Sequence, residues 1–152
     1  MNIFKALIAS HDTQRSLSAQ LRDSLGNDTE RARIFEELKL ELQAHETAEE
    51  RCFYVPLFEH DDTVDASRHA IAEHHEMDEM VESLEKMDPH SREWTDCIHK
   101  LLDKIEHHLK EEEGKFFQQA GEVLTEAQKE SLGRDYVAEH ASMREKVEQA
   151  EE

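Results

Sequence analysis

Two stretches of the sequence carry the same unusual arrangement of histidine, glutamate and aromatic residues. One spans residues 45–54 and the other residues 108–117, and both read His, three residues, Glu-Glu, two residues, Phe and a second aromatic residue. Side chains four residues apart lie on the same face of an α-helix. Each stretch therefore brings an imidazole and a carboxylate together, which is a combination suited to binding a metal ion.

These pairs, His45 with Glu49 and His108 with Glu112, continue apolar stripes. Leucine or isoleucine stands three and seven positions before each histidine, so the pair faces the same side as the expected core. An unpaired charged group is costly there. A bound metal ion is the simplest partner for both pairs.

Two other helical segments contribute one inward histidine each. At about 100° per residue, His11 and His74 fall among the apolar residues of their segments, whereas the neighbouring His75 and His107 point away from the apolar face. The candidate ligands are therefore four imidazoles and two carboxylates: His11, His45, Glu49, His74, His108 and Glu112.

Six ligands fit two divalent transition metals better than one. They exceed the four that a tetrahedral zinc site holds, whereas Glu49 and Glu112 can bridge two ions. With a solvent oxygen between the ions, positions stay open for a small molecule. The ferritin-like di-iron pattern needs Glu three residues before His, but Leu42, Ile71 and Ile105 occupy those positions.

The elements that position these residues are predicted to be helices. Helical patterns cover about residues 2–24, 30–58, 64–86 and 91–120, and no strand pattern occurs. Asn27 with Glu30 predicts a capping box at the start of the second helix. Pro56 is expected to loosen the last turn of that helix. The aromatic residues that close the two repeated stretches are expected to plug one end of the core.

The fold class is therefore all-α, an up-down-up-down four-helix bundle with an additional C-terminal helical segment. We expect residues 1–120 to form the bundle and residues 121–152 to pack on or flank it. Gly121 is expected to end the fourth helix. Thr125 with Gln128 predicts a short segment that Gly133 stops, followed by a polar helix over about residues 134–149.

Composition excludes several classes of partner. The 152 residues carry a formal net charge of −19, which repels nucleic acid and anionic membrane surfaces. No apolar run approaches the roughly 20 residues of a membrane span, and the first ten residues do not read as a signal peptide. The two cysteines, Cys52 and Cys97, do not form a disulfide framework, which favours a reducing cytoplasm.

At this point the sequence resembles the hemerythrin-like family of His-His-Glu cation-binding bundles over about residues 1–120. The resemblance rests on these residues: His11, His45-x3-Glu49-Glu50, Glu73-His74 and His108-x3-Glu112-Glu113. It implies two non-haem iron ions with a bridging oxo or hydroxo group, held by the six candidate ligands with Glu49 and Glu112 bridging. It also implies that dioxygen, nitric oxide or peroxide binds there.

One position departs from the oxygen-carrying members of that family. They have a fifth histidine four residues after the third-helix histidine, where this chain has Asp78. The departure argues against reversible oxygen carriage and favours members linked to oxygen or redox sensing and stress response. Asp78 is either a ligand or a hydrogen-bond partner of a coordinating imidazole.

Three functions are compatible with the sequence. The first is a di-iron protein that binds a small molecule, which is favoured over an enzyme because no general acid or nucleophile stands out besides the ligands. The second is a di-iron redox enzyme or iron donor in oxidative and nitrosative stress defence and repair. The third is a structural bundle that holds zinc or iron for stability alone.

Overall fold

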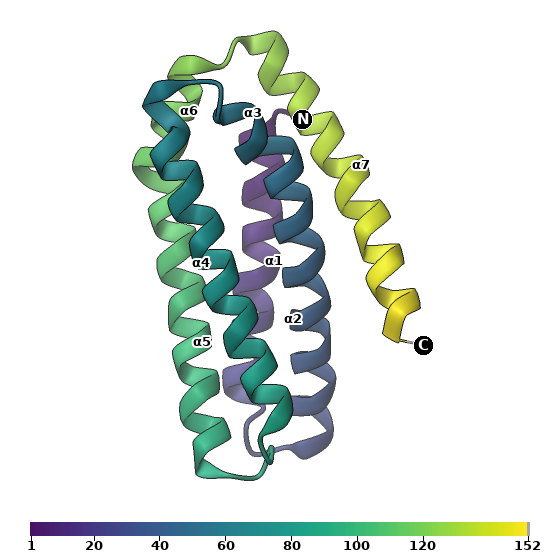
Figure 1. The fold of residues 1–152 in the computed structure, drawn as a ribbon. Coiled ribbons are helices and arrows are strands. Elements are labelled where there is room, and N and C mark those ends of the chain that lie inside the picture. The colour runs from purple at the N-terminus through teal and green to yellow at the C-terminus, as the bar shows by residue number, and fades with distance from the viewer. Residues whose placement is uncertain (152) are drawn as a thin grey trace.

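Four long helices run antiparallel to their neighbours in the computed structural model, which describes residues 1–151 (Figure 1). A fifth long helix lies along the outside of this bundle. The five long helices are α1 (Ile3–Asp23), α2 (Asp28–Glu49), α4 (Asp61–Lys86), α5 (Arg92–Glu111) and α7 (Glu126–Glu151). No β-strand occurs within the described part of the chain. The prediction of an all-α four-helix bundle with an additional C-terminal helix is confirmed.

Side chains cap the first backbone N–H groups at the starts of α2 and α7. The Asn27 side chain accepts a hydrogen bond from the Glu30 backbone N–H at 3.1 Å, which is one half of the capping box predicted for α2. The other half does not form, because the Asn27 N–H donates to the Ser24 carbonyl. Thr125 and Gln128 cap each other reciprocally before α7, at 2.8 and 3.1 Å. Each cap satisfies backbone donors that the first helical turn leaves without a partner.

A π-helical turn interrupts the bundle helix in both repeated stretches. The turn η1 (Glu50–Tyr54) leads into α3 (Val55–Leu57), and η2 (Glu112–Phe116) leads into α6 (Phe117–Val123). Pro56, which has no backbone N–H to donate, lies in α3 one residue beyond Val55, the first residue after η1. Gly114 lies inside η2 with φ −84° and ψ −114°, outside the helical region.

These turns change which residues face the core. A π turn contains one residue more than an α turn, so the apolar stripe resumes one position later. Both Phe53 and Tyr54 are buried as a result, and so are both Phe116 and Phe117. The helix after η2 continues to Val123, so the prediction that Gly121 ends it is wrong.

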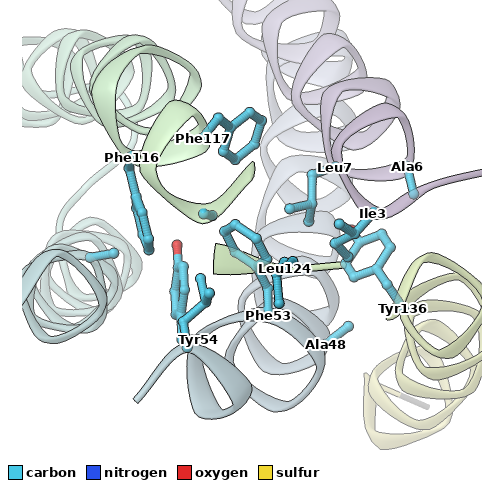
Figure 2. Close-up of a cluster of buried hydrophobic side chains, with 13 residues drawn as sticks. Ile3, Ala6, Leu7, Ala48, Phe53, Tyr54, Phe116, Phe117, Leu124 and Tyr136 are labelled. Atoms are coloured by element: carbon cyan, nitrogen blue, oxygen red, sulfur yellow. The ribbon is translucent and has the colours of Figure 1, made fainter. Parts of the chain in front are cut away.

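The apolar core divides into two clusters along the bundle. One cluster gathers the aromatic residues that follow the repeated His-x3-Glu-Glu stretches with Ile3 and Leu7 of α1 (Figure 2). The other, around Leu38, Trp94 and Leu101, fills the opposite end. The predicted ligands lie on segments between the two clusters. None of the described helices combines the length and apolar character needed to cross a bilayer.

Helix α7 packs against α1 and α2 (Figure 1). Its Tyr136 is buried in the aromatic cluster at 2 % exposure. Polar contacts to α2 follow along the same helix: His140 Nε2 lies 2.7 Å from Glu41, and Arg144 lies 3.4 Å from the same carboxylate. The C-terminal helix is therefore fixed to the bundle by one buried aromatic residue and a series of ion pairs.

Gly133 lies inside α7 and does not stop it, contrary to the sequence prediction. The chain start passes directly over this glycine: an added Cβ would lie 2.2 Å from the Met1 carbonyl oxygen and 2.8 Å from the Ile3 nitrogen. The amino terminus is drawn beside the first half of α7 in Figure 1. Gly133 is therefore explained by close contact between two backbones.

We predict that Gly133→Ala destabilises the protein. Alanine alone favours a helix over glycine by about 1 kcal/mol, but overpacking against backbone costs about 1–3 kcal/mol or more. We expect a net loss that lowers the melting temperature in thermal unfolding by about 2–4 °C for each kcal/mol. Gly26→Ala is the control, because nothing lies within 4 Å of its added Cβ. Equal melting temperatures for the two variants would contradict the explanation.

Candidate metal centre

All six predicted ligand residues meet in the layer between the two apolar clusters. None is more than 3 % exposed. They come from every helix of the bundle: His11 from α1, His45 and Glu49 from α2, His74 from α4, His108 from α5 and Glu112 from the start of η2. The structure therefore brings together each residue that the sequence pattern selected.

Glu49 lies at the middle of this layer. Its Oε1 is 3.2 Å from the Nε2 atoms of both His45 and His74, and its Oε2 is 3.7 Å from Nε2 of His11. The carboxylate thus faces imidazoles from three different helices. That position suits a group shared between two neighbouring cations.

Glu112 occupies the matching position on the other side. Its two oxygens lie 3.3 Å from Nε2 of His11 and 3.5 Å from Nε2 of His108. The Tyr54 hydroxyl donates to Glu49 at 2.7 Å and also contacts Glu112. A single buried phenol therefore ties the two carboxylates together.

The other ring nitrogen of each inward histidine has a fixed partner. The Nδ1 contacts are His11 with Glu113 at 2.7 Å, His45 with Tyr136 at 2.7 Å, His74 with Glu50 at 3.1 Å and His108 with Glu73 at 2.9 Å. An ionised carboxylate only accepts hydrogen bonds, so it holds the proton on Nδ1. In the three rings held by carboxylates, Nε2 therefore faces inward, and it is the atom through which such histidines bind a metal once it carries no proton.

The inward atoms lack hydrogen-bond partners among the described residues. They are the four histidine Nε2 atoms, Oε2 of Glu49 and Oε1 of Glu112. A buried polar atom without a partner costs about 1–3 kcal/mol, so six such atoms in one layer demand an explanation. Nitrogen and carboxylate donors of this kind fit divalent transition metals.

The donor atoms form two groups that share Glu49. His11, His45 and Glu49 make one group, and Glu49, His74 and His108 make the other, with the atoms of each group within 4.8 Å of one another. Glu112 belongs to neither group, although it lies between His11 and His108. The arrangement offers places for two adjacent cations, with one carboxylate common to both.

Burial and mutual repulsion set the charges of this layer in the protein without metal. Burial and the charge of Glu49 raise the pKa of Glu112 to about 8. Burial also opposes a charge on His11, but the carboxylates of Glu112 and Glu49 outweigh it and raise the pKa of that imidazole to about 10. At neutral pH both groups hold protons that a metal ion would have to displace.

The pKa values of the other four candidate ligands shift in different directions, because their surroundings differ. Burial lowers the pKa of His45 and of His108. For His74, burial is outweighed by Glu49 and Glu50, so its pKa lies well above the usual value. Glu49 is buried but sits among imidazoles, chiefly His45, which hold its pKa well below the usual range.

The aromatic rings that follow the repeated stretches plug one end of the core, as the sequence predicted (Figure 2). Tyr54 and Phe116 stack with ring centroids 5.8 Å apart, and Phe117 stacks on His11 at 6.0 Å. The rings exclude water from this side of the donor atoms. Tyr54 combines this packing with its hydrogen bonds to the two carboxylates, a role that its sequence position did not reveal.

Two other residues were missed or left open by the sequence. Tyr136 was not singled out, because a lone tyrosine in a polar C-terminal helix gives no signal that it contacts His45. Asp78 neighbours Glu46, and burial together with this neighbouring carboxylate raises the pKa of Glu46 well above its usual value. Asp78 thus lies against a carboxyl group.

A cavity of about 400 Å³ opens beside the layer between α4 and α5. Its lining includes His108 and Glu112, which are buried, as well as the exposed His69. Ala70 and Phe116 supply apolar wall. The cavity therefore leads from solvent toward two of the candidate ligands.

Comparison with known proteins gives one family and one solved structure. Residues 2–120 match the hemerythrin HHE cation binding domain family. The fold is similar to the crystal structure of a hemerythrin HHE cation binding domain-containing protein from Mycobacterium kansasii, with a TM-score of 0.85 and 24 % identity. The alignment covers 96 % of this chain and 89 % of that one. No curated protein matches the sequence.

We predict that Tyr136→Phe lowers stability measurably. The Tyr136 hydroxyl lies 2.7 Å from His45 Nδ1 and 2.6 Å from Ser10 Oγ, so its removal leaves buried polar atoms without a partner, at a cost of about 1–3 kcal/mol. Denaturant unfolding of the metal-free protein followed by circular dichroism measures the loss. The control Val137→Ala changes an exposed neighbour and should shift stability by only about 0.5 kcal/mol. Equal effects would contradict the importance of this contact.

Proposed function

Because the chain belongs to the hemerythrin HHE cation binding domain family, we propose that it is a non-haem di-iron protein that binds a small molecule such as dioxygen or nitric oxide. Its biological use would be oxygen or redox sensing or the response to oxidative and nitrosative stress. The observation that carries the proposal is the layer of six inward donor atoms that have no hydrogen-bond partner among the described residues.

The proposed ligands are the six residues of this layer: His11, His45, Glu49, His74, His108 and Glu112. Glu49 and Glu112 are the bridging carboxylates in this proposal, since each lies within 3.7 Å of imidazoles from different helices. Bound iron would supply the change of oxidation state and the open positions that small oxidants need.

The surrounding residues hold the imidazoles in place. Each Nδ1 is bonded to a residue outside the ligand set, so the ring cannot rotate without breaking that contact. Such outer hydrogen bonds orient metal ligands and increase their basicity. Tyr54 fixes the two carboxylates relative to each other and keeps a proton within hydrogen-bond reach of both.

A route for a small molecule supports binding over a purely structural role. The cavity beside the layer is lined by His108 and Glu112 and reaches solvent near His69. Structural zinc sites are closed and usually have four protein ligands. Here six donor atoms face an interior that a cavity approaches, which favours a centre with an accessible position.

The first test is the metal content of protein produced in iron-replete medium, together with its absorbance before and after dithionite. We expect two irons per chain and near-ultraviolet absorption bands that bleach on reduction. A reversible spectral change with oxygen or nitric oxide supports binding, whereas repeated turnover of peroxide or nitric oxide would favour the enzyme. A colourless zinc protein that responds to neither would favour the structural role.

The ligand assignment is tested in the same assay with His45→Ala and Glu112→Ala. Both variants should lose metal and thermal stability together, because the remaining donors form an incomplete site. His75→Ala is the matched control: it removes an exposed histidine next to a proposed ligand and should retain the natural metal content. Full metal content in both ligand variants would show the assignment to be wrong.

We also predict that metal affinity rises with pH. The pKa of Glu112 is raised to about 8 and that of His11 to about 10, so metal binding at neutral pH must release protons from both groups. Each proton released adds about tenfold in affinity per pH unit. From about pH 7.5 to about pH 8.5 we therefore expect Zn²⁺ affinity to rise at least about tenfold. Ligands with ordinary pKa values would give a nearly flat affinity over this interval.

The measurement is a competition titration against a chromophoric chelator whose own pH dependence is known. Zn²⁺ serves as a probe that does not change oxidation state. An affinity that is constant over the interval, after correction for the chelator, would mean that the two protons are absent from the metal-free protein.

A further inference from the structure

Outside the six-residue layer, two further His-x3-Glu pairs meet across α4 and α5. They are His69 with Glu73 and His107 with Glu111; Glu73 is buried at 5 % exposure and the other three side chains are exposed. A third pair on α4, His75 with Glu79, is not among the residues that converge. Within the pairs, Nε2 of His69 is 3.5 Å from Glu73 and Nε2 of His107 is 3.2 Å from Glu111. The pairs also meet across the helices, since Nε2 of His69 is 3.1 Å from Glu111. The local geometry of the buried layer is thus repeated at the surface.

Three of these side chains converge like metal ligands. One donor atom each from His69, Glu73 and Glu111 lies within 4.8 Å of the others. An imidazole with two carboxylates suits a divalent transition metal. The nearby Lys104 is held by Glu76 at 2.6 Å and approaches the other oxygen of Glu73, at 3.8 Å. The oxygen of Glu73 that faces His69 is not the one that faces the lysine.

The cavity between α4 and α5 provides a second, independent observation. Its wall contains His69, Glu73 and Glu111, and its lining also includes His108 and Glu112. The last two are buried at 3 % and 2 % exposure, and each has a donor atom without a hydrogen-bond partner. The surface cluster and two proposed ligands of the buried layer thus line one continuous space.

Charge favours a cation in this space. Besides the protonated Glu112, the lining carries three carboxylates, on Asp65, Glu73 and Glu111, against the single ammonium of Lys115. A hollow lined by one sign of charge concentrates counter-ions. The formal net charge of −19 on the whole chain acts in the same direction.

The carboxylate of Glu73 contacts both the surface cluster and the buried layer. Glu73 Oε1 faces His69 on its outer side and lies 2.9 Å from Nδ1 of His108 on its inner side. A cation at the surface cluster would therefore be one hydrogen bond away from an imidazole of the buried layer. The cluster lies in the wall of the same cavity as His108 and Glu112.

We propose that His69, Glu73 and Glu111 form a binding site for a divalent cation in the wall of this cavity, through which metal ions pass on their way into the buried centre. The passage into the centre rests on the proposed function, whereas the surface site stands on its own residues. This site binds more weakly than the buried centre, because it offers three protein donors and is open to water.

The test uses the metal-free full chain and Co²⁺ as the probe. Equilibrium dialysis counts the ions bound, and stopped-flow absorbance follows the rate at which the buried sites fill. The variants are His69→Ala and Glu111→Gln, which change exposed side chains and leave the proposed buried ligands intact. The matched controls His75→Ala and Glu79→Gln change exposed residues of α4 outside the cluster.

The natural chain and both controls should bind two Co²⁺ tightly and one more weakly. His69→Ala and Glu111→Gln should lose the weak ion, keep the two tight ions, and fill the buried sites several-fold more slowly. An unchanged weak ion in both variants would overturn the surface site. Loss of the weak ion with an unchanged filling rate would overturn the passage.

Failure of the proposed function gives a different result. If the natural chain takes up no tightly bound ions but still binds a weak one that His69→Ala removes, the surface site stands. The buried centre and the passage would then both be wrong.

Discussion

A layer of buried polar atoms that do not satisfy one another is the constraint on which this structure depends. Four imidazole nitrogens and two carboxylate oxygens have no hydrogen-bond partner within residues 1–151, and apolar clusters pack on both sides of the layer. Folding such a layer costs free energy that only protons or metal ions can recover. The raised pKa of Glu112 and of His11 shows how the chain accommodates the layer without metal, by retaining protons.

The rest of the bundle keeps these groups in register. Each imidazole is held from behind through Nδ1, three of them by carboxylates and His45 by the Tyr136 hydroxyl. Tyr136 comes from α7, outside the residues that match the family. The C-terminal helix therefore contributes directly to the order of the centre. A change in the position of His45 would alter its hydrogen bond to Tyr136. Binding at the centre could therefore change the position of α7, which lies on the outside of the bundle (Figure 1).

The sequence indicated which side chains would face one another in this layer, because that information is local. The spacing of His45 with Glu49 places both on one helical face whatever the rest of the chain does, and the apolar stripe sets the direction of that face. Features that depend on contacts between distant segments could not be predicted in this way. Gly133 resembled a helix stop, but its role is set by the backbone of Met1 and Ile3 crossing α7. Tyr136 reaches His45 across 91 positions of sequence.

The π turns could be predicted from the sequence only in part. Pro56 indicated a weak point in the second helix, but not that an extra residue would bring Tyr54 to the two carboxylates. The ligand assignments and the division of the chain at residue 120 stay predictions. The surface cluster of His69, Glu73 and Glu111 used the same His-x3-Glu spacing, and its meaning became visible only when α4 and α5 were placed side by side.

Anomalous diffraction at the iron absorption edge, from crystals of the iron-loaded protein, tests the central claim most directly. The account predicts two peaks within the bundle, both in the layer between the inward Nε2 atoms, with Glu49 adjacent to both. One peak with a closed set of four ligands, or no peak and histidines bonded to ordered water, would contradict it.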